Sequence, residues 1–284
     1  MADDKHEPKH PSPSSPIGVF DSGVGGLSVL RAIRRLIPNE DLIYLADQTH
    51  VPYGSRSLDE VRRFSEAISH YFLETHSVKQ VVVACNTASA AALHHLRDTF
   101  PDMPFVGMEP AVKPAAENTL SGVVGVLATP ATFQGELYAS VVERFANGVS
   151  VLQHDCPGLV AEIEAGRIDG PVVRGILQEA LGPMLEQGLD TVVLGCTHYP
   201  FVIPVIQQVV GSEVQVIDPA PAVARQAARL LGDRGLRSSQ DDPGSLRCLT
   251  TGEPAAFARL ATELLGEPCA VARVGWGKEL KLEK

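Results

Sequence analysis

Several features of exported, membrane-spanning and nucleic-acid-binding proteins are missing from this 284-residue chain. No apolar run approaches the roughly 20 residues that cross a bilayer, and the N-terminus, MADDKHEPKHPSPSSP, lacks the apolar centre of a signal peptide. The net charge is -10 and no basic cluster is denser than Arg31, Arg34 and Arg35, which disfavours direct binding to nucleic acid. The five cysteines include no CxxC pair, so we expect free thiols in a reducing compartment, the cytoplasm.

Motifs for common cofactors are also missing. The segment Gly23-Val24-Gly25-Gly26 lacks the third glycine of a dinucleotide fingerprint and the Lys-Ser/Thr of a P-loop, so a NAD-linked dehydrogenase is a minor alternative. No lysine follows a predicted strand, where a pyridoxal Schiff base would be expected. Lys79 and Lys113 are expected to be solvated. We therefore expect an activity without a cofactor.

What is present indicates a folded α/β protein. Hydrophobic residues make up 44% and charged residues 20%, which is typical of globular proteins, and the length favours two domains. Short β-branched runs alternate with helical stretches, which predicts parallel sheets flanked by helices. Ser57 with Glu60 predicts a capping box, and Pro171 the first turn of a helix. The predicted strands are residues 17–20, 42–45, 81–84, 104–107, 123–127, 149–152, 191–194 and 214–217.

The predicted strands form two sets of four with matching sequence. Val83-Ala84-Cys85 resembles Leu194-Gly195-Cys196, and two further pairs share this offset of about 110 residues, which favours a duplicated lobe. We predict two similar α/β lobes related by pseudo-twofold symmetry. The boundaries are a disordered tail (1–16), a first lobe (17–111 plus 219–284) and a second lobe (112–218). Ligands bind beyond the carboxyl ends of such strands, so the active site is expected in the cleft between the lobes.

Cys85 and Cys196 follow equivalent strands of the two sets. Each thiol would lie where a strand meets a helix N-terminus, whose N–H groups favour the thiolate. A lone cysteine after an apolar run is more often a core residue, but recurrence in both lobes favours a reactive pair. Two opposed thiols suit inversion of a carbon centre, because one group removes a proton from one face while the other delivers a proton to the opposite face.

Polar side chains near these strand ends are candidate partners. A free thiol is only about 3% ionised at pH 7, so Asp21 and His198 are expected to assist the cysteines. Asp21 could equally cap a helix, and a zinc site on Cys196 and His198 is disfavoured because no second ligand pair exists, so no metal is expected. The glycine loop, with Ser22 as a further donor, would bind a carboxylate. Further neutral donors suit a ligand with two carboxylates, although each alone could be a helix cap: Asn86, Thr87, Thr129, Thr132 and Thr197.

Five motifs occur in order: DSGVGGLSVL, VPYGSRS, ACNTASA, ATPATF and GCTHYP. With them, the chain from Pro16 to about Gly277 resembles the glutamate racemases of the cofactor-independent aspartate/glutamate racemase superfamily. The resemblance implies that Cys85, assisted by Asp21, deprotonates D-glutamate. It implies that Cys196 deprotonates L-glutamate, assisted by His198 and by Glu164, with Glu162 as the alternative. The implied substrate-binding residues are Asp21, Ser22, Pro52, Tyr53, Gly54, Asn86, Thr87, Thr129, Thr132, Thr197 and His198.

The resemblance also implies a biological role and leaves alternatives open. Bacterial members supply D-glutamate for peptidoglycan, and many are homodimers whose arrangement varies. A racemase or isomerase of the same superfamily that acts on aspartate or a hydantoin is the nearest alternative, since two opposed thiols serve those substrates too. A two-lobe protein that binds an amino acid without chemistry is disfavoured by the paired thiols.

Overall fold

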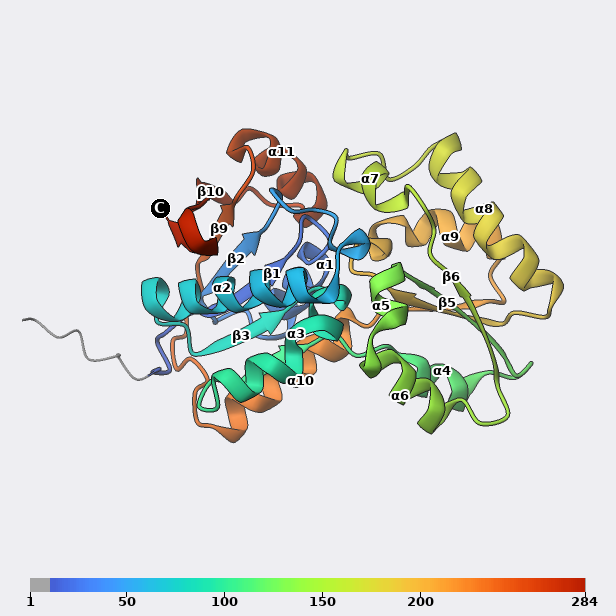
Figure 1. Ribbon diagram of the computed structural model, residues 1–284, viewed down its shortest axis with the longest axis horizontal. Helices are drawn as coiled ribbons and strands as arrows, with labels where there is room; N and C mark the ends of the chain where they lie inside the picture. The colour runs from blue at the N-terminus through green and yellow to red at the C-terminus, as the bar shows by residue number, and fades with distance from the viewer. Residues whose placement is uncertain (1–10, 284) are drawn as a thin grey trace, which may run out of the picture.

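The computed structural model describes residues 11–283, which form two α/β lobes placed side by side (Figure 1). The first lobe contains a six-stranded sheet in the order β10-β9-β2-β1-β3-β4, and the second a four-stranded sheet in the order β6-β5-β7-β8. Every strand pair within these sheets is parallel. The prediction of parallel sheets in a two-lobe fold is confirmed. The strands are β1 (Ile17–Asp21), β2 (Leu42–Ala46), β3 (Gln80–Val83), β4 (Phe105–Gly107), β5 (Val123–Ala128), β6 (Ser150–His154), β7 (Thr191–Gly195), β8 (Gln215–Ile217), β9 (Leu246–Thr250) and β10 (Ala270–Arg273).

The two sheets share one strand order. In each set of four, the order across the sheet is second, first, third and fourth strand: β2-β1-β3-β4 in the first lobe and β6-β5-β7-β8 in the second. A duplicated lobe predicts this shared order. The late strands β9 and β10 extend the first sheet beyond β2. A short antiparallel hairpin of β11 (Gly275–Trp276) and β12 (Leu282–Glu283) follows, and no sequence pattern predicted it.

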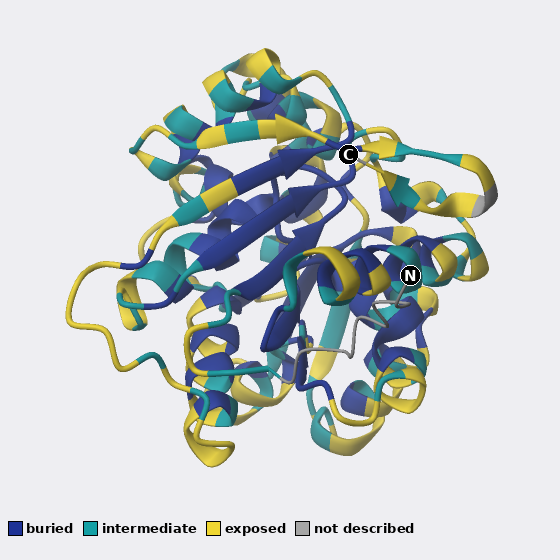
Figure 2. Cartoon of the chain, turned by 90° about the vertical axis from the view of Figure 1, so that its left-hand side faces the viewer, coloured by how far each residue is buried: buried dark blue, intermediate teal, exposed yellow. Residues whose placement is uncertain are grey.

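Helices cover both faces of each sheet, so the central strands are buried (Figure 2). In the first lobe, α1 (Leu27–Leu36), α10 (Ala220–Asp233) and α11 (Pro254–Leu265) share one hydrophobic cluster, while α2 (Leu58–His76) and α3 (Asn86–Thr99) share another. The second lobe has α4 (Val112–Asn118), α5 (Pro130–Gln134) and α6 (Glu136–Phe145) on one side, and α7 (Leu159–Glu164), α8 (Pro171–Glu186) and α9 (Ile203–Val210) on the other. The cluster that contains α1 continues into the second lobe through α7, α8 and α9, which joins the lobes by apolar packing.

The helix-terminus motifs identified in the sequence form the predicted caps. Ser57 accepts the Glu60 N–H and the Glu60 carboxylate accepts the Ser57 N–H, which forms the predicted capping box of α2. Pro171 is the first residue of α8. No helix among residues 11–283 is long and apolar enough to cross a membrane.

Two expectations at the N-terminal side of the first lobe differ from the structure. Residues 1–10 of the predicted tail lie outside the described residues, but residues 11–16 are tied to the first lobe: the Lys79 ammonium donates to the Pro13 carbonyl, and the Lys79 N–H donates to the Pro16 carbonyl. The expectation of a solvated Lys79 is wrong, because its side chain is fully buried and pairs with Glu40, which is also buried. A buried lysine requires such a partner, and the sequence does not reveal one 39 residues away.

Candidate active site

A small pocket lies where the carboxyl-end loops of the two sheets face each other. Its lining comprises Ser22, Pro52, Tyr53, Gly54, Cys85, Asn86, Thr87, Thr129, Val160, Cys196, Thr197 and His198. Its free space is about 20 Å³, room for about one water molecule, so the lobes are closed on each other. Both cysteines are buried and free in this pocket.

Cys85 occupies the position that its sequence context predicted. It follows β3 and caps α3, and its Sγ accepts the Ala88 N–H at 3.4 Å. Asp21, the last residue of the neighbouring strand β1, is fully buried. Its Oδ2 accepts the N–H groups of Gly26 at 2.8 Å and Gly23 at 3.3 Å, while Oδ1 has no hydrogen-bond partner among the described residues. Asp21 therefore organises the loop before α1 and also interacts with the Cys85 thiol.

Cys196 has a different environment. It follows β7, but α9 begins only at Ile203, after the 3₁₀ turn η2 (Tyr199–Val202), so the prediction that Cys196 lies at an α-helix N-terminus is wrong. Its partner is His198, whose Nδ1 lies 3.7 Å from Sγ. The other ring nitrogen, Nε2, lies 2.6 Å from Oε1 of Glu164. Cys196, His198 and Glu164 thus form a hydrogen-bonded chain that starts at the thiol.

Of the two candidate glutamates in α7, only Glu164 contacts this chain. Glu162 forms an exposed bidentate pair with Arg167, through bonds of 2.6 and 2.8 Å. The two carboxylates are two residues apart on a helix, so they point in different directions. This geometry selects Glu164 as the partner of His198.

The glycine loop between β1 and α1 faces the second lobe. Its Val24 N–H donates to Glu164 at 2.8 Å, and the Gly23 and Gly26 N–H groups are bound to Asp21. These donors are therefore occupied by the protein's own carboxylates, whereas the sequence suggested that they would bind a substrate carboxylate. A side chain at Gly23 would overlap Glu164, so glycine is required by the close approach of the lobes.

Neutral polar side chains cover the remaining wall of the pocket. The hydroxyls of Thr87, Thr129 and Thr132 form a triangle with sides of 2.9, 2.9 and 3.4 Å, and Thr87 belongs to the first lobe while the other two belong to the second. Asn86 is 4% exposed, yet neither its amide nitrogen nor its amide oxygen has a partner among the described residues. A buried polar group without a partner destabilises the folded state, so the Asn86 amide is a candidate for hydrogen bonding to a ligand.

Comparison with known proteins decides the assignment. The sequence matches the family model described as Asp/Glu/Hydantoin racemase over residues 17–227. The chain belongs to this racemase family. A glutamate racemase of Roseiflexus sp. (strain RS-1) is 52% identical over 250 residues, which cover 88% of this chain and 92% of the relative. The resemblance carried by the five motifs is thereby confirmed.

Solved structures of other members have the same fold. A glutamate racemase of Bacillus anthracis is 34% identical with a TM-score of 0.83, and the match covers 92% of this chain and 97% of that one. A glutamate racemase of Francisella tularensis, solved in complex with D-glutamate, is 30% identical with a TM-score of 0.80, and the match covers 93% and 98% of the two chains. The racemases of this family are isomerases.

The two thiols of this racemase differ in electrostatics. Burial, and secondly the charge of Asp21, raise the pKa of Cys85 well above its usual value, so this thiol holds its proton. Burial lowers the pKa of His198, but the contacts with Cys196 and Glu164 outweigh it and raise that pKa well above its usual value. Burial raises the pKa of Glu164, but the contact with His198 outweighs it and lowers that pKa. Cys196 therefore lies beside an imidazolium–carboxylate pair.

Sequence reasoning found most residues of this site. Asp21, Thr132 and Glu164 do not line the pocket itself, but each contacts or neighbours a residue that does. Val160 in α7 lines the pocket and was missed, because an apolar residue in a helix looks like any core residue. Gln48, which donates to Glu164 at 3.5 Å, was missed because the contact joins segments of different lobes.

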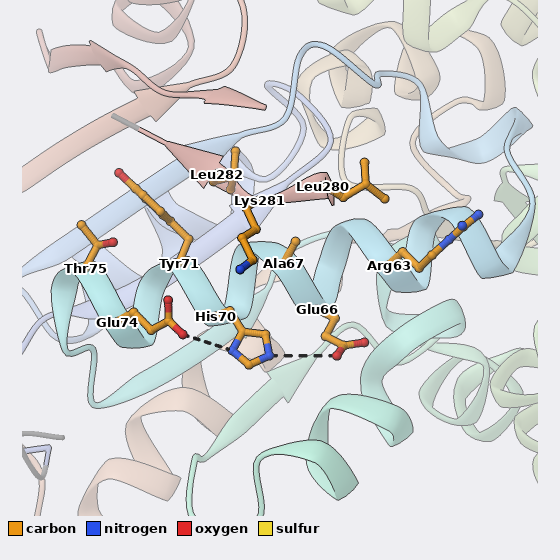
Figure 3. Close-up of a pocket in the computed structure, with 10 residues that line it drawn as sticks. All are labelled: Arg63, Glu66, Ala67, His70, Tyr71, Glu74, Thr75, Leu280, Lys281 and Leu282. Carbon is orange, nitrogen blue, oxygen red and sulfur yellow. Dashed lines mark ion pairs between the residues drawn. The ribbon is translucent and has the colours of Figure 1, made fainter. Parts of the chain in front are cut away.

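A larger cavity of about 440 Å³ lies elsewhere, between α2 and the C-terminal hairpin (Figure 3). In its wall, His70 lies between Glu66 and Glu74, at 4.0 and 3.7 Å. It contains neither of the strand-end cysteines. Size alone therefore does not mark the reactive site in this chain.

Proposed function

We propose that this racemase interconverts L- and D-glutamate by a cofactor-independent two-base mechanism, with Cys85 and Cys196 as the bases. The observation that carries the proposal is that two thiols from equivalent strand ends line one closed pocket. Cys85 lies beside Asp21, and Cys196 is linked through His198 to Glu164. Racemisation requires acid and base groups on opposite faces of the α-carbon. Because Cys85 belongs to the first lobe and Cys196 to the second, the two thiols would approach a bound ligand from two sides.

The proposed reaction conserves one proton within the pair of thiols. With L-glutamate, the Cys196 thiolate removes the α-proton, and the protonated Cys85 delivers its proton to the opposite face of the carbanion. The product is D-glutamate with Cys196 protonated and Cys85 ionised, and the reverse reaction starts from that state. The raised pKa of Cys85 favours the state that accepts L-glutamate. Asp21 assists Cys85, and His198 with Glu164 assists Cys196.

Glutamate is the proposed substrate because of the site chemistry and the named relatives. The unpaired amide of Asn86 and the threonine triangle are neutral partners for carboxylate and amine groups at one end of the pocket. Ser22, Thr197 and the Pro52-Tyr53-Gly54 segment line the rest, and they complete the proposed set of substrate contacts. Aspartate and hydantoins are the alternatives that turnover must exclude.

The biological setting is proposed by the same resemblance. We place the enzyme in the cytoplasm, where it would supply D-glutamate for peptidoglycan synthesis. A homodimer is the proposed assembly. Glutamate itself is the proposed small-molecule partner.

In the deciding experiment, purified and reduced protein is incubated with L-glutamate in heavy water, without added pyridoxal phosphate or metal. Optical rotation and deuterium at the α-carbon are measured over time. Optical rotation is expected to decay while deuterium enters the α-carbon of the D-product, because the delivered proton equilibrates with solvent. Turnover of aspartate at least as fast as that of glutamate would overturn the substrate assignment. Absence of both signals would overturn the proposed function.

Variants test the two bases separately. Cys85→Ser and Cys196→Ser are each expected to lower racemisation by at least about 10²-fold, because a serine hydroxyl is a far weaker acid than a thiol and is hardly ionised at neutral pH. Circular dichroism and melting temperature should remain close to those of the wild type. Cys156→Ser is the matched control: this buried cysteine belongs to the hydrophobic core, so its replacement should lower stability rather than the turnover of the folded fraction.

A further inference from the structure

A buried carboxylate, Asp47, lies beneath the loop of residues 50–54. It follows β2 directly and is fully buried. Its Oδ2 accepts the Tyr53 hydroxyl at 2.7 Å and lies 2.9 Å from Nδ1 of His50. Burial and the charge of Asp47 raise the pKa of Tyr53 well above its usual value, so the Tyr53 hydroxyl remains a donor. One oxygen of Asp47 is thus fully used in holding the loop.

The second oxygen is held by residues from the distant C-terminal part of the chain. Oδ1 accepts the hydroxyl of Thr251 at 2.9 Å and the indole N–H of Trp276 at 2.7 Å. Thr251 follows β9, and it also accepts two hydrogen bonds from Thr49, at 2.9 and 3.0 Å. The ring of Trp276 packs edge-on against His50, with centroids 5.0 Å apart. Asp47 therefore joins the loop to a C-terminal anchor.

The other side of the same loop forms a wall of the active site. Pro52, Tyr53 and Gly54 line the pocket, whereas Asp47 and Trp276 do not. The fit is tight, because a Cβ at Gly54 would lie 2.6 Å from Thr129 of the second lobe. A shift of the loop by a fraction of an ångström would therefore change the space for substrate.

We infer that Trp276 is a positioning residue for the substrate, because through Asp47 it fixes the loop that carries Pro52, Tyr53 and Gly54. The inference rests on the proposed function. Trp276 comes from the hairpin β11–β12, which belongs to neither parallel sheet, so its contribution to the site is separable from the core of the lobes. Asp47 has four hydrogen-bonding contacts, two at each carboxyl oxygen, and loss of one leaves a buried oxygen underbonded.

A double-mutant cycle tests this path. Trp276→Phe keeps an aromatic ring and removes only the N–H donor, and Tyr53→Phe removes the donor from the loop side. Trp276→Phe is expected to raise KM for glutamate about tenfold, with a smaller change in kcat. In the double variant, KM should stay close to that of Tyr53→Phe, since the link from Asp47 to the loop is already weakened. If the increase in KM of the double variant equals the product of the two single increases, or if KM is unchanged in Trp276→Phe, the inference is overturned.

A matched control separates positioning from hairpin stability. Leu282 pairs with Trp276 in the hairpin and has no hydrogen bond to Asp47 among the described residues, so Leu282→Ala should loosen the hairpin while keeping the indole donor, with a smaller effect on KM. Equal KM values in Leu282→Ala and Trp276→Phe would contradict the inference.

Hydrogen exchange gives a readout that needs no turnover. Amides of residues 49–54 should exchange faster in Trp276→Phe than in the wild type and in Leu282→Ala. If the wild type does not racemise glutamate, the proposed function fails, and exchange alone decides whether Trp276 holds the loop. Unchanged exchange in Trp276→Phe would then reject that role.

Discussion

The residues around Cys196 show how one contact gives a side chain its role. Glu164 and Glu162 are identical in type and lie on one short helix, but only Glu164 contacts His198, whereas Glu162 pairs with the exposed Arg167. The sequence left both open, because the distinction depends on where α7 points relative to the other lobe. Contacts between lobes are of this kind, and no local pattern encodes them.

The two glutamates provide a matched pair of substitutions. Glu164→Gln is expected to lower kcat/KM by about 10- to 100-fold, the effect of losing one charged, buried hydrogen bond that keeps His198 protonated. Glu162→Gln should leave kcat/KM near the wild-type value, because its partner Arg167 is exposed. Steady-state racemisation of both variants tests this, and equal losses would show that Glu164 has no special role.

In the proposed mechanism, the pH profile reports the proton shared by the two thiols. L- and D-glutamate have equal free energy in water, so kcat/KM must be equal in both directions at every pH. Its alkaline limb should lie above the usual pKa of cysteine, because burial and the Asp21 charge hold the last proton on Cys85. Asp21→Asn keeps an acceptor for the Gly26 N–H but removes the charge, so the pKa of Cys85 falls. The alkaline limb of kcat/KM should therefore move to lower pH in Asp21→Asn. A limb at the wild-type pH would mean that it reports a group other than Cys85.

At the scale of elements, local signals were sufficient to predict most of the structure. Each of the eight predicted strands exists within one or two residues, because β-branched runs bounded by turn residues have a short-range physical cause. The C-terminal hairpin was not predicted, since β11 and β12 are two residues each and their pairing depends on packing against α2. The burial of Lys79 was missed for the same reason: Glu40 is remote in sequence.

One testable element is the turn that connects α4 to β5. The Asp190 carboxylate accepts hydrogen bonds from the Thr119 hydroxyl and from the N–H groups of Leu120 and Ser121, at 2.6 to 2.7 Å. Asp190→Ala is expected to lower the free energy of unfolding by about 1 kcal/mol, as for loss of a capping carboxylate. Thermal unfolding measures this, with Asp233→Ala as control, because Asp233 forms an exposed ion pair with Arg229 on the surface of α10.

The contribution of Asp190 should depend on pH. Although burial raises the pKa of Asp190, the hydrogen bonds from Thr119, Ser121 and Leu120 outweigh it and lower that pKa to about 2. A lowered pKa in the folded state means that the unfolded chain binds the proton more readily, so the stabilisation is complete above the ordinary carboxyl pKa. It is lost as pH falls toward 2. The stability difference between wild type and Asp190→Ala should therefore shrink in acid, and a constant difference would contradict this cause.

At the scale of the whole molecule, the closed pocket implies that the lobes must separate. About 20 Å³ cannot hold glutamate, and contacts across the cleft keep it closed: Ser28 donates to the Thr197 carbonyl at 3.0 Å, Val24 to Glu164, and Thr87 pairs with Thr129. The same contacts assemble the Cys196 side, because Glu164 bridges His198 and the first lobe. Closure of the lobes and the proposed activation of Cys196 therefore depend on the same carboxylate, Glu164.

Ser28 allows this coupling to be tested without touching the pocket. Its single O–H is shared between the carbonyls of Gly25 in its own lobe, at 2.8 Å, and Thr197 in the other, at 3.0 Å, so Ser28→Ala removes a closing contact but no pocket-lining group. Loss of about 1 kcal/mol shifts the open–closed equilibrium about fivefold, which should raise KM by up to that factor and increase the radius of gyration in solution scattering. Ser65→Ala is the control, since the Ser65 hydroxyl is equally buried but donates within α2 to Val61. A rise in KM in the control alone, or in neither variant, would show that Ser28 does not hold the lobes closed.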